Sequence, residues 1–215
     1  MRAARLPSAQ SEPTALDTLA TVEAALVTLA GVVRQGVTAG ALDLDEADLR
    51  LIEAMQCQDE AHAHLLASLG AVPVTAAFAL QPRATASRAM ALAALHSLKE
   101  IALGAQMALA RSLAGSDDAA LAETLFALGA VEGSHAALLR GRLGEEPASD
   151  RAFLPWRFAD PLEALPVLAE SGLLDDAPDA VLYPGPLERR CAGVFGLVPE
   201  TTEDELRWDE PTGGA

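Results

Sequence analysis

Two pairs of residues in this sequence share one spacing. Asp59 and His62 are three residues apart, and so are Glu132 and His135. On an α-helix, positions i and i+3 lie on nearly the same face, so each pair would direct a carboxylate and an imidazole to one side. Oxygen and imidazole donors together suit iron or manganese better than metals that prefer thiolates. The two pairs therefore predict a metal site built on helices.

Two single glutamates complete the candidate ligand set. Glu23 and Glu100 each interrupt a stripe of apolar residues that recurs at steps of three and four. In a four-helix bundle, a Glu from each of two helices and a carboxylate-x-x-His pair from each of the other two surround a di-iron or di-manganese centre. The sequence thus predicts six metal ligands: Glu23, Asp59, His62, Glu100, Glu132 and His135.

Charge favours metal at such a site, and a metal-free network is the alternative. Four carboxylates in a dry core would repel each other, whereas two divalent cations with neutral imidazoles make the ligand shell neutral. Without metal, hydrogen bonds among the same side chains could fix the register of an ordinary bundle. His96 lies one turn before Glu100, where it either supports that ligand or is a core histidine.

Four segments with helical periodicity would position these residues. Start and stop signals place them at 14–35, 45–69, 85–114 and 116–143. A rise of about 1.5 Å per residue puts all six candidates at similar heights if the helices form two antiparallel hairpins. The segment 70–84 is long enough to cross the length of the bundle between them. We expect an all-α fold, a four-helix bundle with a long crossover between its second and third helices.

Composition excludes several other classes of protein. The 215 residues are 51% hydrophobic and 4% aromatic, with a net charge of −16 and a single lysine, Lys99. Nucleic acids and anionic membranes need a basic surface, so we expect neither as a partner, and cations fit better. The longest uncharged stretch, 61–82, is interrupted by glycine, proline and histidine, so no transmembrane segment is expected there.

The last third of the chain differs from the rest. Prolines recur after Gly144, so we divide the chain into a bundle domain, 1–145, and a proline-rich extension, 146–215. We expect the extension to contain short helices at about 160–172 and 187–195 and to end in an acidic tail. The two cysteines are distant in sequence and in no metal spacing, and we expect two reduced thiols in a cytoplasmic protein.

Several phrases resemble the bacterial ferritin-like domain proteins of the ferritin-like superfamily. These are Gln-Asp-Glu-Ala-His at 58–62, Leu-Gly-Ala-Val-Pro at 69–73, Val-Glu-Gly-Ser-His at 131–135 and Phe-Ala-Asp-Pro-Leu at 158–162. The resemblance spans about 16–170. It implies a di-metal carboxylate protein that holds two iron ions, with manganese as an alternative. Asp59 stands where the family usually has Glu. The first predicted helix, 14–35, has Leu26 at the position where the family usually has its Glu.

The function expected from the sequence is therefore that of a ferroxidase or oxidoreductase of the di-iron carboxylate type. It would oxidise Fe(II) or activate oxygen or peroxide. Because no Tyr or Trp lies in the predicted bundle, a tyrosyl-radical mechanism is not expected. Assembly into a homo-oligomer stays open. The alternative is a metal-free helical scaffold that acts as an interaction or assembly module through its C-terminal extension.

Overall fold

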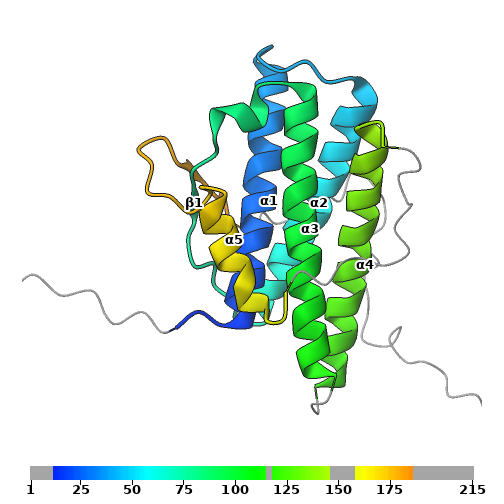
Figure 1. Ribbon diagram of the computed structural model, residues 1–215, viewed down its shortest axis with the longest axis vertical. Helices are drawn as coiled ribbons and strands as arrows, with labels where there is room; N and C mark the ends of the chain where they lie inside the picture. The colour runs from blue at the N-terminus through cyan, green and yellow to red at the C-terminus, as the bar shows by residue number, and fades with distance from the viewer. Residues whose placement is uncertain (1–11, 115–117, 146–157, 186–215) are drawn as a thin grey trace, which may run out of the picture.

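Four long helices form the body of the molecule. The computed structural model describes residues 12–114, 118–145 and 158–185. Its main helices are α1 (Ala15–Thr38), α2 (Glu46–Ser68), α3 (Arg88–Leu113) and α4 (Ala119–Arg142). They pack side by side as a bundle, with α1 against α2 and α3, and α3 against α4 (Figure 1). The predicted all-α four-helix bundle is confirmed.

Helix ends follow the sequence signals at α2, but they differ at the end of α1 and at the start of α3. Asp45 is the N-cap of α2, and its side chain accepts a hydrogen bond from the backbone N–H of Asp48. Gly70 follows α2 with a φ of 86°, the left-handed conformation that stops a helix. Gly36 directly follows the helix predicted at 14–35, but α1 continues past it to Thr38. Gly40, with a φ of 69°, takes the left-handed position instead.

The connection between α2 and α3 is the predicted crossover. It contains β1 (Ala77–Phe78) and η1 (Pro82–Thr85), and it runs along one side of the bundle, so α2 and α3 point the same way (Figure 1). The third helix starts slightly later than expected because the chain first makes the η1 turn. Ser87 then caps α3, its side chain accepting a hydrogen bond from the backbone N–H of Met90.

The C-terminal segment packs onto the bundle. It forms η2 (Pro161–Glu163), α5 (Ala164–Glu170) and β2 (Val181–Leu182), which confirms the short helix expected near 160–172. β2 pairs antiparallel with β1, and η2 and α5 contact α1 and α3. Phe158, Ala164 and Leu168 are buried in the same core as the bundle helices. The expected helix at 187–195 and the acidic tail at 200–215 lie outside the described residues.

Ionic contacts join three helices near one end of the bundle. Asp48 of α2 is fully buried. Arg88 of α3 donates to Asp48 from Nε at 2.5 Å and from Nη2 at 3.0 Å. Arg142 of α4 donates from Nε to the same carboxylate at 2.6 Å. We call these three residues the Asp48 clamp, because they hold α2, α3 and α4 together at that end.

Two further findings bear on the environment of the chain. Among the described residues, helix α1 is long and apolar enough to cross a membrane by length and composition, and 78% of that window is buried inside the bundle. Cys57 is disulfide-bonded, so the expectation of a reduced thiol at this position is wrong. Cys191 lies outside the described residues. The cytoplasmic location expected from reduced thiols therefore loses that support.

Candidate functional site

Four of the six predicted ligands meet in the middle of the bundle. Glu23 of α1, Asp59 and His62 of α2, and Glu132 of α4 each offer a ligand atom, and these atoms all lie within 4.8 Å of one another. All four side chains are buried, with exposures of 6% or less. We call these residues the carboxylate cluster. The helix pairs and the crossover bring together residues that are more than 100 positions apart in sequence.

His62 lies between two carboxylates of the cluster. Its Nδ1 is 3.2 Å from Oε1 of Glu132 and 3.7 Å from Oε1 of Glu23. Among the described residues, Oε2 of Glu23 has no hydrogen-bond partner, although it is buried. Buried polar atoms without partners are costly and rare. A cation at this point would give that oxygen a partner, so these residues fit a metal ion.

His135 lies beside the carboxylate cluster. Its Nδ1 is 4.0 Å from Oδ1 of Asp59 and 3.9 Å from Oε1 of Glu132. On the other side of the ring, Nε2 hydrogen-bonds Oε1 of Gln58. Because that amide oxygen can only accept, Nε2 carries the proton, and in the neutral ring Nδ1 keeps its lone pair. Gln58 thus orients His135 as a metal ligand would be oriented.

Glu100 lies outside the carboxylate cluster. Its carboxylate is 3.9 Å from Nε2 of His96, and the Glu100 side chain is 17% exposed. The stripe predicted to face inward on this helix contains His96 and Glu100, both of which are only partly buried. The fully buried polar residues of α3 are Lys99 and Gln106. Each residue turns a helix by about 100°, so α3 is rotated by about one residue from the expected orientation.

Lys99 is a residue of the site that the sequence did not predict. Its side chain is fully buried, and Nζ contacts Oδ1 of Asp59 and lies 2.9 Å from Oε2 of Glu132. Lysine is almost never buried unless it is paired, and here it joins carboxylates from α2 and α4. A signal was present in the sequence, because Leu92, Lys99 and Gln106 recur every seven residues on one face of the helix.

Gln106 positions the carboxylate of α1. It is fully buried, and its Nε2 donates to Oε1 of Glu23 at 2.9 Å. The sequence alone does not predict a role for Gln106. This hydrogen bond holds Oε1, the Glu23 oxygen that lies 3.7 Å from Nδ1 of His62.

Burial dominates the pKa values of two carboxyl groups. It raises the pKa of Glu23, and the nearby charge of Glu132 raises it further. Burial also raises the pKa of Asp59, to about 8, although the charge of Lys99 opposes this. In the absence of metal, protons therefore compensate part of the negative charge of the site.

The pKa values of His62, Glu132 and His135 depend on neighbouring charged groups as well as on burial. Burial disfavours the charged form of His62, but Glu132 and Glu23 outweigh it and raise the pKa to about 10. Burial opposes ionisation of Glu132, yet Lys99 and His62 bring its pKa down to about 2. Burial and the charge of Lys99 lower the pKa of His135 to about 3. His135 is therefore neutral, the form in which imidazole binds metals.

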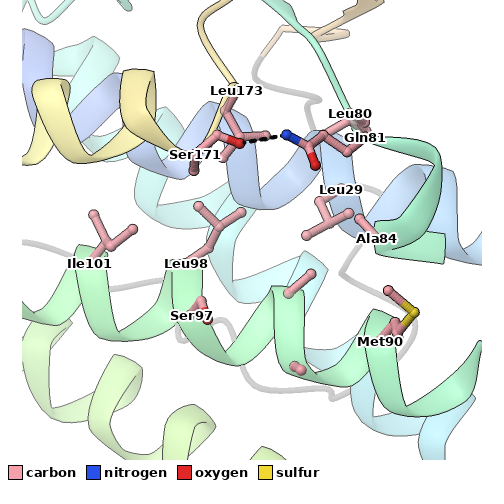
Figure 2. Close-up of a pocket in the computed structure, with 12 residues that line it drawn as sticks. Leu29, Leu80, Gln81, Ala84, Met90, Ser97, Leu98, Ile101, Ser171 and Leu173 are labelled. Carbon is pink, nitrogen blue, oxygen red and sulfur yellow. Dashed lines mark hydrogen bonds between the residues drawn. The ribbon is translucent and has the colours of Figure 1, made fainter.

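A separate apolar pocket lies on the opposite side of α3. Its volume is about 390 Å³, and Leu29, Leu98, Ile101 and Leu173 are among its lining residues (Figure 2). None of the residues that line it belongs to the carboxylate cluster, and none is titratable. The pocket therefore offers a surface for apolar contact, whereas the groups that could do chemistry are in the cluster.

Comparison with known proteins gives no further identification. The chain matches no protein-family profile, no curated protein and no solved structure. Any function therefore has to be argued from the geometry of the site.

Proposed function

We propose that this protein is a ferritin-like bundle that binds a transition-metal ion at the carboxylate cluster and oxidises Fe(II) or activates oxygen or peroxide. One observation carries the proposal, namely that four donor atoms from three helices lie within 4.8 Å of one another in a dry core. An arrangement of this kind is costly unless a cation compensates it.

The donor set favours iron or manganese. Glu23, Asp59 and Glu132 offer carboxylate oxygens, and His62 offers an imidazole nitrogen. Hard oxygen donors with imidazole suit iron and manganese, and no thiolate is part of the set. A bound iron or manganese ion would supply the change of oxidation state that reaction with oxygen or peroxide requires.

The protein's own residues would hold and orient this ion. Glu23, Asp59, His62 and Glu132 would bind it, and Gln106 would keep Glu23 in place through the 2.9 Å hydrogen bond to Oε1. The surrounding apolar side chains exclude water, which strengthens electrostatic interactions within the site.

A metal-free scaffold is the second candidate, and Lys99 favours it. The ammonium group contacts Asp59 and lies 2.9 Å from Oε2 of Glu132, so it compensates part of the carboxylate charge without metal. In this case, the buried network would fix the register of a bundle that acts as an interaction or assembly module.

Metal analysis separates the two candidates. The purified protein would be loaded with Fe²⁺ without oxygen, desalted and analysed for iron per chain, together with Glu132→Gln. Glu123→Gln is the matched control, because Glu123 lies on the same helix but is exposed. We expect iron in the parent and the control and its loss in Glu132→Gln. Exposure to air should then oxidise the bound Fe²⁺. Iron in none of the three proteins would favour the metal-free scaffold.

A further inference from the structure

We infer that the Lys99 ammonium occupies the position of a second metal ion, so that the carboxylate cluster accepts one metal ion and not two. The inference rests on the proposed function and specifies the number of ions. It differs from the two-ion centre that the sequence predicts, and it follows from the cationic side chain that α3 contributes.

The two oxygens of Glu132 point to two different cation positions. Oε2 lies 2.9 Å from Nζ of Lys99, whereas Oε1 lies 3.2 Å from Nδ1 of His62. Glu23 is on the His62 side, 3.7 Å from the same Nδ1. Glu132 therefore bridges two halves of the site, one of which contains the ammonium of Lys99, while the other contains Glu23 and His62.

The half of the site that contains Lys99 is otherwise built like a ligand shell. Asp59 contributes Oδ1 and Glu132 contributes Oε2, both in contact with the ammonium. Nδ1 of His135 lies 4.0 Å from the same Asp59 oxygen. A carboxylate from α3 would complete this half, but Glu100 lies beside His96, and Lys99 takes the inward position.

The net charge of the site also indicates one divalent metal ion. The three carboxylates of the cluster, Glu23, Asp59 and Glu132, carry three negative charges when ionised, and the buried Lys99 supplies one positive charge. One divalent ion with neutral imidazole ligands then makes the site neutral. A second divalent ion beside Lys99 would leave two excess positive charges in a dry core, which is strongly unfavourable.

The test measures how many ions bind. The full chain would be titrated with Mn²⁺, and the bound metal would be counted by elemental analysis and examined by EPR, which distinguishes an isolated Mn²⁺ ion from a coupled pair. Lys99→Glu replaces the ammonium with the missing carboxylate. Glu100→Gln is the matched control, because it changes the neighbouring residue of the same helix.

We expect one isolated Mn²⁺ ion in the parent and in Glu100→Gln, and a coupled pair in Lys99→Glu. Two ions in the parent, or loss of the ion in Glu100→Gln, would overturn the inference and leave the proposed function standing. No bound ion in the parent would overturn the proposed function itself. The count in the parent decides the inference even if Lys99→Glu does not fold.

Discussion

Replacing Lys99 with methionine tests whether its buried charge holds the metal-free bundle together. Methionine keeps the length and apolar part of the side chain but removes the ammonium. Asp59 and Glu132 would then lose the cation that they contact. Breaking a buried ion pair by removing one partner costs about 3–5 kcal/mol. For a domain of this size, that loss corresponds to a decrease in Tm of roughly 6–20 °C.

The assay is urea denaturation and thermal melting in the presence of a chelator, with unfolding monitored by circular dichroism. The matched control is Arg50→Met, because Arg50 pairs with Glu46 at the surface with 75% of its side chain exposed. We expect no measurable change in the control. The double variant Lys99→Met with Asp59→Asn should recover part of the stability, since it also removes one of the uncompensated carboxylates. A loss below about 1 kcal/mol in Lys99→Met would refute the contact.

Three further predictions concern protons and metal. Because the pKa of His62 is raised from 6.5 to about 10, its stabilising contribution is complete below pH 6.5 and lost as the pH rises to 10. Urea titrations of the metal-free protein should therefore show falling stability over that range, with a shallower fall in His62→Gln. Mn²⁺ at about 100 times its Kd should stabilise the parent by about 2.7 kcal/mol in thermal melts, and this gain should be absent in Glu132→Gln. Gln106→Leu, which removes the hydrogen bond to Glu23, should weaken Mn²⁺ binding about 10–100-fold in calorimetric titrations, and unchanged affinity would contradict the role of Gln106.

Much of the site could be predicted because it depends on spacing within single helices. The i, i+3 spacing of Asp59 with His62 needs only an α-helix to bring the two side chains to one face. Glu23 interrupts an apolar stripe, and the structure buries it fully. The crossover could also be predicted, because the segment 70–84 is too long for a tight turn and contains two prolines.

The orientation of α3 could not be predicted in the same way. Both faces of this helix are apolar enough to be buried, since it packs against α1 on one side and α4 on the other. The stripe through Glu100 and the stripe through Lys99 therefore fit the same periodicity. The stripe through Lys99 is the buried one because Lys99 pairs with carboxylates on α2 and α4. These are tertiary contacts, which the sequence of a single helix does not reveal.

The distance between the Asp48 clamp and the candidate site constrains how the helices align along the bundle axis. Asp48 precedes Asp59 by eleven residues, Arg88 precedes Lys99 by eleven, and Arg142 follows Glu132 by ten. At about 1.5 Å per residue, these spans are each about 15–17 Å along the bundle axis. The clamp and the ion pairs of Lys99 with Asp59 and Glu132 thus lie at matching distances along α2, α3 and α4. Sliding any one helix by a turn would break both sets of ion pairs at once, so the chain has a single axial alignment in which both are satisfied.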